Sequence, residues 1–242
     1  TPNRPALAAG MARPADSSAF FTDAGKFYDF LRSNDMLGPV ITAKEFAGCE
    51  NTIIGFGMAG APVSYCAYGL ATKFLETNGS MEPVREAYWL TLKQAEAYAR
   101  RMYDIQGARP SKARELGNLT PGDGARYMGR GDVQLTGLTN YRRATAKLRA
   151  LGYDVDLVKN PERAMEPQIA AVIMVYGMIE GWFTGRKLSD DLPSTGAATF
   201  KQFEDSRDII NGRDKDDVIA RFAIDFQTAL LRGGYRPARL AA

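Results

Sequence analysis

The 242-residue chain contains no histidine. This absence excludes Ser-His-Asp triads, Cys-His dyads, histidine-based zinc motifs and imidazole proton shuttles. Any acid–base chemistry must therefore come from carboxylates, tyrosine, lysine or cysteine.

Cysteine is almost as scarce, with only Cys49 and Cys66. Two cysteines form no disulfide framework, and their spacing is not that of a redox or metal-binding CxxC motif. Cys66 lies among apolar residues at helical spacing, so we expect a buried free thiol. We expect no metal site and no cofactor.

The chain has little net charge, with 31 Lys/Arg against 28 Asp/Glu and a formal charge of +3. It has no dense cluster of basic residues of the kind that binds nucleic acid. We therefore expect no nucleic-acid partner.

Residues 51–72 contain no charged side chain, which raises the question of a membrane span. Gly55, Gly57, Gly60 and Pro62 interrupt this run. A connection between two buried helices explains the run better, and we expect no stable membrane insertion.

The first 20 residues are rich in Pro, Ala and Ser and are predicted to form a flexible tail, without a visible secretory signal. Residues 21–242 show no internal repeat and no linker, so we expect a single domain. The uses of residues 1–60 stay open.

Apolar spacing and capping residues predict a mainly helical chain. Thr42 with Glu45 forms a capping box for a helix that the following glycines should end near Ile54. The predicted helices cover 22–34, 42–54, 63–76, 92–102, 140–148, 167–181, 200–210 and a last segment that ends at 233.

Residues 169–179 are apolar on every side, which predicts a buried central helix. Residues 104–126 are predicted to be a long loop because of their many glycines and prolines. Residues 127–136 read as a small hairpin, in which Val133 and Leu135 alternate with polar side chains. Thr139 or Asn140 should cap the helix that follows.

The predicted helix 63–76 has an apolar stripe and a second face with Tyr65, Tyr68 and, at its end, Glu76. Two aromatic rings beside a carboxylate are typical of a sugar-binding cleft. An ordinary amphipathic helix that ends in an exposed glutamate would show the same pattern.

Glycoside hydrolysis needs one carboxylic acid to protonate the leaving oxygen and a second carboxylate as base or nucleophile. Without histidine, this is the most economical acid–base chemistry available to the chain. Glu76 is a candidate acid, and Glu82 and Glu86 lie within reach across the predicted turn at 78–80.

The segment 127–136, Tyr-Met-Gly-Arg-Gly-Asp-Val-Gln-Leu-Thr, is followed by Asn140-Tyr141. It resembles the signature of the family-nineteen glycoside hydrolases, which include chitinases and many bacteriophage endolysins. Segments 71–86, 180–188 and 207–212 resemble the phage branch. The resemblance covers roughly residues 65–233.

The resemblance implies a lysozyme-like α+β fold, with helices around a buried central helix and a small β hairpin. It also implies cleavage of β-1,4 bonds between N-acetylated sugars, with inversion. The family's acid is the Glu of a His-Glu-Thr triplet that ends a helix, and this triplet corresponds to Leu75-Glu76-Thr77. Leu75 in place of histidine makes the surroundings of Glu76 more apolar, or it marks a lapsed site.

In short-loop members of the family, the base lies nine or ten residues after the acid, which fits Glu86 and not Glu82. The alternative is that Glu86 is a surface partner of Arg85 or Lys93. Thr77 would support the acid.

Other residues correspond to positions that bind sugars or support the acid in the family. Their alternative roles are hairpin hydrogen bonds, a helix cap, a turn and structural ion pairs. The candidates for substrate binding are Tyr127, Arg130, Gln134, Thr136, Asn140 and Asn211, and Arg207 is a candidate support of the acid.

These observations favour a phage or prophage endolysin of the muramidase type, a monomer that binds peptidoglycan glycan chains. It would wait in the host bacterial cytoplasm and reach the wall in the periplasm after the membrane is permeabilised. A chitinase that acts on chitin is one alternative. A non-catalytic wall-binding or virion module with the same fold is another.

Overall fold

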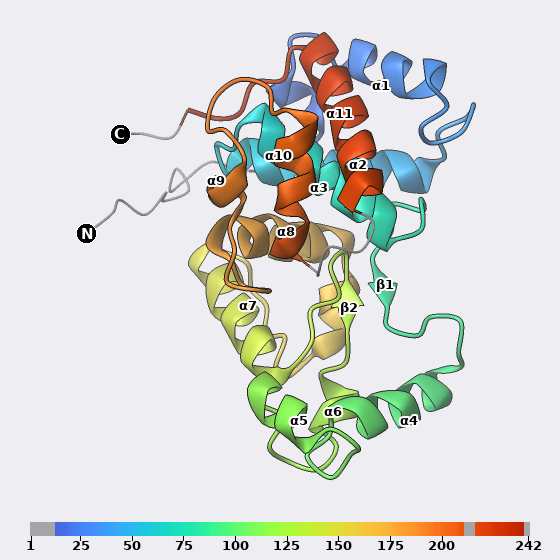
Figure 1. Ribbon diagram of the computed structural model, residues 1–242, viewed down its shortest axis with the longest axis vertical. Coiled ribbons are helices and arrows are strands. Elements are labelled where there is room, and N and C mark those ends of the chain that lie inside the picture. The colour runs from blue at the N-terminus through green and yellow to red at the C-terminus, as the bar shows by residue number, and fades with distance from the viewer. Residues whose placement is uncertain (1–12, 211–215, 240–242) are drawn as a thin grey trace. The chain divides into compact units, whose positions relative to one another are not determined.

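The computed structural model describes residues 13–210 and 216–239. It is mostly helical, with one small antiparallel sheet of two strands, as expected for a mainly α fold (Figure 1). The chain forms two compact units. Unit 1 comprises residues 1–81 and 174–242, and unit 2 comprises residues 82–173. The single domain expected for 21–242 stays a prediction.

Unit 1 is built around two helices distant in sequence, α3 (Val63–Glu76) and α11 (Asp216–Gly233), which pack along each other (Figure 1). Helices α1 and α10 also pack on α11, and α2 packs on α3. The other elements of this unit are η1 (Ser17–Phe20), α1 (Ala24–Ser33), α2 (Ala43–Met58), α9 (Leu188–Asp191), α10 (Phe200–Asp205) and η3 (Ser206–Ile209).

The capping box predicted for α2 is confirmed, because the side chains of Thr42 and Glu45 cap each other's backbone amides. The predicted end near Ile54 is wrong, since α2 continues to Met58. A Cβ at Gly57 would lie 2.5 Å from the ring of Phe20. This glycine allows a close contact inside the helix and does not end it.

The expected tail ends earlier than residue 20, because Ser17–Phe20 forms a 3-10 helix. The backbone amide and hydroxyl of Ser17 each donate to the buried carboxylate of Glu50 at 2.6 Å. Phe20 is buried as well. A buried carboxylate requires such donors, so this segment belongs to the core of unit 1. Residues 1–12 lie outside the described residues.

Unit 2 contains the sheet, in which β1 (Val84–Arg85) pairs with β2 (Arg130–Gly131). Val84 lies opposite Gly131, and Arg85 opposite Arg130. The helices of this unit are α4 (Leu92–Tyr103), α5 (Pro110–Leu116), α6 (Asp123–Arg126), α7 (Leu138–Ala150) and η2 (Pro161–Met165).

The hairpin predicted in 127–136 is present, but it is shorter than predicted and has one bridge between Arg130 and Leu135. Arg130 and Leu135 exchange both backbone hydrogen bonds, at 3.3 and 2.8 Å, and so close a tight loop. The pairing of β2 with β1 was not predicted. A strand of two residues is too short to show an alternating pattern.

The long loop predicted for 104–126 is wrong, because it contains α5 and α6. Pro110 is the first residue of α5, and Gly117 ends it in the left-handed conformation, at φ 74°. Proline commonly begins a helix, and glycine commonly follows its last residue. The cap predicted for α7 is also wrong, since Gly137, at φ 89°, precedes the helix.

Helix α8 (Pro167–Glu180) is buried along most of its length, as its apolar sequence predicted. The boundary between the two units falls within it, after Ile173. Cys49 and Cys66 are both buried free thiols. None of the helices in the described ranges is both long and apolar enough to cross a bilayer.

Candidate active site

Helix α3 does not present an aromatic face to a cleft, which corrects the prediction for Tyr65 and Tyr68. Tyr68 is fully buried, donates to the carbonyl of Ser206 at 2.8 Å and stacks on Phe203. A Cβ at Gly69 would meet the ring of Phe56 at 2.1 Å. Packing on several sides buries both faces of α3.

Glu76 ends α3 and keeps 19% of its side chain exposed. Its Oε1 accepts a hydrogen bond from Nη1 of Arg207 at 3.1 Å, and the Arg207 side chain is only 5% exposed. The Glu76 carboxylate therefore does not lie in the apolar surroundings that Leu75 led us to expect. It contacts the guanidinium of Arg207, which fits both a support of the acid and a structural ion pair, so the role of Arg207 stays a prediction.

Thr77 fixes the turn that follows Glu76. Its buried hydroxyl donates to the carbonyl of Lys73 at 2.7 Å and accepts from the amide of Met81 at 3.0 Å. These bonds hold the last turn of α3 and the departing chain together. Thr77 thus supports the position of Glu76 through the backbone.

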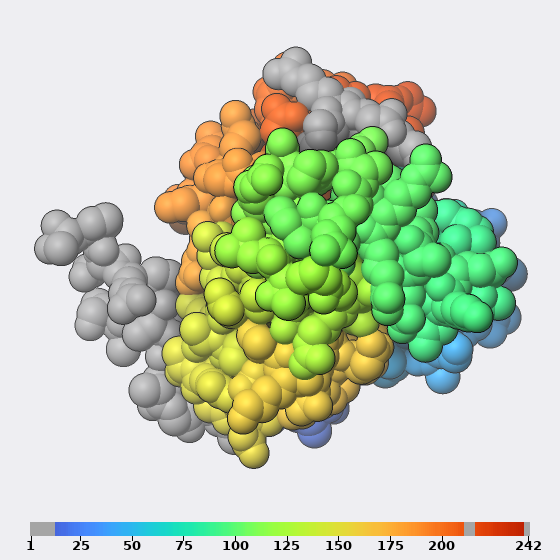
Figure 2. All heavy atoms as spheres, turned by 90° about the horizontal axis from the view of Figure 1, so that it is seen from below, coloured from blue at the N-terminus to red at the C-terminus, as the bar shows by residue number. Residues whose placement is uncertain are grey.

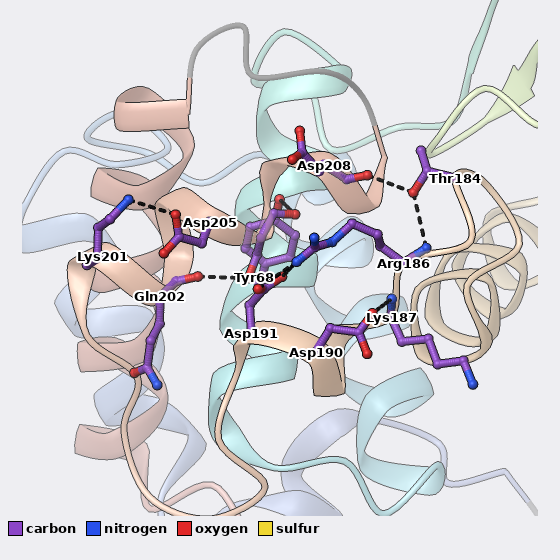
Figure 3. A network of polar contacts seen from close by, with 11 residues as sticks. Tyr68, Thr184, Arg186, Lys187, Asp190, Asp191, Lys201, Gln202, Asp205 and Asp208 are labelled. Atoms are coloured by element: carbon purple, nitrogen blue, oxygen red, sulfur yellow. Dashed lines mark hydrogen bonds and ion pairs between the residues drawn. The ribbon is translucent and has the colours of Figure 1, made fainter.

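The segment that carries Arg207 is anchored on both sides, and Figure 3 shows one of these contacts, between Thr184 and Asp208. Tyr68 bonds the carbonyl of Ser206, and the hydroxyl of Thr184 donates to the carbonyls of Asp208 and Ile209 at 2.7 and 3.1 Å. These contacts hold η3, and with it Arg207, at a fixed position in unit 1.

Arg186 and Asp191 form an ion pair in the same network (Figure 3). Nη2 of Arg186 lies 2.7 Å from each carboxylate oxygen of Asp191. The hydrogen bond that Arg186 donates to Asp191 raises the pKa of the Arg186 guanidinium. This pair ties α9 to the chain after α8.

Glu86 directly follows β1 in unit 2, where two donors hold its carboxylate. The hydroxyl of Tyr103 donates to Oε1 at 2.5 Å, and the amide of Gly129 donates to Oε2 at 3.1 Å. Burial and this hydrogen bond raise the pKa of Tyr103 above its usual value. The alternative was a surface ion pair with Arg85 or Lys93, and neither pair is formed in the described structure. Arg85 donates to the backbone carbonyls of Glu86 and Leu90.

Gly129 lets Gln134 approach Glu86. A Cβ at Gly129 would lie 2.6 Å from Oε1 of Gln134 and 3.1 Å from Oε2 of Glu86. Nε2 of Gln134 donates to the carbonyl of Val84 at 2.8 Å, which fixes the amide beside the carboxylate. Unit 2 therefore brings the predicted base and a predicted sugar-binding residue together.

Two residues at this place have strained backbones. Ala87, at φ 52°, and Gln134, at φ 54°, adopt the left-handed conformation although neither is glycine. Such conformations cost about 1–3 kcal/mol each and tend to cluster at functional sites. The strain adjoins Glu86 in the sequence and in space.

Thr136 and Asn140 continue the polar row that starts at Gln134. The Thr136 hydroxyl donates to the carbonyl of Gln134 at 2.8 Å, and Nδ2 of Asn140 donates to the carbonyl of Thr136 at 2.9 Å. All three side chains are half-buried. These bonds are the hairpin hydrogen bonds expected as the alternative role, and sugar binding by the three side chains stays a prediction.

Tyr127 and Arg130 lie in the interior, which argues against direct contact with substrate. Nη1 of Arg130 donates to the carbonyls of Arg126 and Met128 and to the hydroxyl of Tyr141, at 3.0 to 3.1 Å. Its Nη2 lies 2.6 Å from Oε1 of Glu162. Arg130 therefore stabilises the loop that carries Gly129, and the ring of Tyr127 packs on that of Tyr141.

Asn211, a predicted substrate contact, lies outside the described residues. Glu82, the other candidate base, is half-buried. In the described part of the chain, no cluster of three or more cysteine or acidic side chains could hold a metal ion.

The sequence analysis missed Tyr103 and the exposed pair Tyr88 and Trp89. The two rings of the pair meet edge to face with centroids 5.3 Å apart, and Trp89 is 73% exposed. Their position just after Glu86 in the sequence could have indicated that Tyr88 and Trp89 lie near the site. Tyr103 gave none, because 17 positions separate it from Glu86.

No protein-family model matches the chain. No curated protein matches it either. A solved structure of a glutamate-to-glutamine mutant of chitinase C matches 92% of this chain and 98% of its own, with a TM-score of 0.50 and 19% identity. Chitinase C from Streptomyces griseus HUT6037 matches 92% of this chain and 81% of its own, with a TM-score of 0.49 and 18% identity.

The fold is chitinase-like. This likeness extends over 92% of the chain, whereas the sequence resemblance covers only about residues 65–233. At this identity it concerns the fold alone.

Proposed function

We propose that this protein is a glycoside hydrolase that cuts β-1,4 bonds between N-acetylated sugars in peptidoglycan strands. The observation that carries the proposal is the arrangement around Glu86. Its carboxylate is held by Tyr103 and Gly129, beside the amide of Gln134 and next to two strained residues. A chitinase-like fold supports it.

In the proposed reaction, Glu76 is the acid and Glu86 is the base. The Glu76 carboxyl gives its proton to the leaving glycosidic oxygen as the C–O bond breaks. The Glu86 carboxylate takes a proton from the water that attacks the anomeric carbon from the opposite face, which inverts its configuration. Exchange with solvent then returns both groups to their starting forms.

Each glutamate is equipped for part of this task. Arg207, 3.1 Å from Glu76, stabilises the carboxylate that Glu76 becomes after it has given its proton. The two donors to Glu86 fix its orientation, and a base must point at the water it activates. The mechanism requires both carboxylates to act on one glycosidic bond.

Peptidoglycan is the first candidate substrate, in keeping with the resemblance to phage endolysins. In that role the protein would act on the bacterial wall after the membrane has been permeabilised. Chitin is the second candidate, because the solved structure with a similar fold is named a chitinase.

The test is digestion of purified peptidoglycan sacculi and of chitin oligomers, with mass spectrometry of the products. New reducing ends on muramic acid are expected from the wild type. Glu76→Gln and Glu86→Gln should each lower the rate by about 10²–10⁴-fold. Glu115→Gln, an exposed glutamate on α5, is the matched control and should act like the wild type.

Three other results would contradict the proposal. Release of reducing ends from chitin alone would identify a chitinase. Binding to sacculi without any new reducing ends would identify a non-catalytic wall-binding module. Full activity of Glu76→Gln would remove Glu76 from the acid role.

A further inference from the structure

Unit 2 contains a pocket of about 390 Å³ at the carboxyl end of α4. Its lining includes Arg100, Arg101, Asp104, Gly107 and Gly122. None of these belongs to the proposed catalytic or sugar-binding residues. Figure 2 looks onto a face on which much of this unit, coloured green to yellow, is in view.

Hydrogen bonds from backbone amides fix the residues that line the pocket. The buried carboxylate of Asp104 accepts from the amides of Gly122 at 2.6 Å and of Gly124 and Gln106 at 3.3 Å. A Cβ at Gly107 would lie 2.5 Å from the carbonyl of Arg100. The charge of Asp104 is thus compensated by backbone donors, and the pocket exists before a ligand binds.

Arg100 and Arg101 are exposed, and across residues 13–210 and 216–239 neither side chain has a hydrogen bond or an ion pair. Other exposed arginines, such as Arg32 and Arg221, pair with acidic neighbours. A guanidinium without a partner at the rim of a pocket can bind an anion without first breaking an ion pair.

The surrounding sequence reinforces this positive charge. Residues 100–115 contain five basic and two acidic side chains. Unit 2 has 15 Lys/Arg against 11 Asp/Glu, so the excess of basic residues in the chain lies here. The field around the pocket therefore favours anionic polymers over neutral ones.

We infer that Arg100 and Arg101 form a subsite for carboxylate groups attached to the glycan strand. Guanidinium groups bind carboxylates through two parallel hydrogen bonds. Peptidoglycan carries carboxylates on its peptides, whereas chitin is neutral. The subsite would therefore favour peptidoglycan over chitin. The inference rests on the proposed function, which names peptidoglycan as the substrate. Binding to the polymer can nevertheless be measured without hydrolysis.

The test is a sedimentation assay of the full chain with three polymers. They are native sacculi, sacculi whose carboxyl groups have been converted to neutral amides, and chitin. The double variant Arg100→Gln, Arg101→Gln should bind native sacculi about five- to tenfold more weakly. Its binding to the two neutral polymers should match that of the wild type.

Arg142→Gln is the matched control, because Arg142 is an exposed arginine of the same unit outside the pocket. It should bind all three polymers as the wild type does. Binding of the wild type to native sacculi should also weaken as the salt concentration rises, a measurement that needs no variant.

Equal binding of the wild type to native and amidated sacculi would overturn the inference. So would an unchanged affinity of the double variant, or an equal loss in Arg142→Gln. If the wild type releases no reducing ends but the double variant loses binding to native sacculi alone, the hydrolase proposal fails and the subsite stands. If hydrolysis occurs and the double variant binds normally, the subsite fails alone.

Discussion

Arg207 and Glu76 are 131 positions apart in the sequence, yet Nη1 of one lies 3.1 Å from Oε1 of the other. The Arg207 side chain is almost completely buried, and the Glu76 side chain keeps about a fifth of its surface in solvent. The end of α3 and the segment η3 are thus joined by one ion pair.

Replacing Arg207 by Met should lower both stability and activity. The change leaves Glu76 without its guanidinium and places an apolar side chain among polar groups. We expect a loss of about 1–3 kcal/mol in the free energy of unfolding, measured with urea. Arg207→Lys should recover part of both losses. Arg221→Met, at an exposed surface pair, should stay within about 0.5 kcal/mol of the wild type.

Tyr103→Phe tests whether Glu86 must be held by its donors. The ring stays, and only the hydroxyl that donates to Oε1 of Glu86 is lost. We expect kcat to fall about tenfold, since a hydrogen bond to a charged group contributes about 1.5 kcal/mol. Tyr98→Phe on the same helix is the control. Equal kcat values for the two variants would mean that this hydrogen bond has no part in catalysis.

Gly129→Ala should harm activity more than folding. Its new Cβ meets the end of the Gln134 side chain first, at 2.6 Å, and then the carboxylate of Glu86. The amide can move away, so we expect a melting temperature within about 4 °C of the wild type. Displacement of both polar groups should lower kcat/KM about tenfold or more. A large drop in melting temperature with normal kcat/KM would contradict this.

Trp89→Ala tests the exposed aromatic pair as a sugar-stacking surface. Loss of the ring removes about 1 kcal/mol of stacking, which corresponds to about a fivefold rise in KM. The melting temperature should not change, because Trp89 is 73% exposed. Leu119→Ala, at a residue 64% exposed in the same unit, is the control for the loss of an exposed apolar side chain. Equal KM values would exclude Trp89 from binding.

Stability should fall at alkaline pH because of buried tyrosines. Burial raises the pKa of Tyr141 from 10.0 to about 12, so the neutral phenol is favoured in the folded state. The resulting stability is fully present below pH 10 and is lost as pH rises through 12, by about 2–3 kcal/mol for this residue.

The measurement is urea unfolding at several values between pH 8 and 12, where the structure survives. Tyr141→Phe lowers stability at neutral pH, since the hydrogen bonds to Met128 and Arg130 are lost. It should also flatten the fall above pH 10. An identical slope in wild type and variant would assign the alkaline loss to other groups, such as Tyr68 or Tyr103.

Several features could be predicted from the sequence because their causes are local. Thr42 and Glu45 lie three residues apart, and their capping box follows from that spacing. The apolar residues of α8 similarly predicted its burial. Glu76 at a helix end and the row from Gln134 to Asn140 were found in the same way, with help from the family resemblance.

Other features depended on the tertiary structure. The pattern of α3 indicated one buried face, but packing buries the other face too. An amphipathic pattern cannot predict that another part of the chain packs against the polar face. A two-residue strand has no measurable period, so β1 was not found. Burial of Arg130 and Tyr127 was equally hidden, because a polar side chain in the interior looks the same in sequence as one in solvent.

The sequence by itself determined where most helices begin, which histidine chemistry is excluded, and which glutamates are candidates. Only the tertiary structure decided which groups contact those glutamates. Glu76 contacts Arg207, and Glu86 accepts hydrogen bonds from Tyr103 and Gly129. The reason is physical. Helix propensity and capping act over a few residues, whereas the contacts that orient a carboxylate join residues that are distant in the chain.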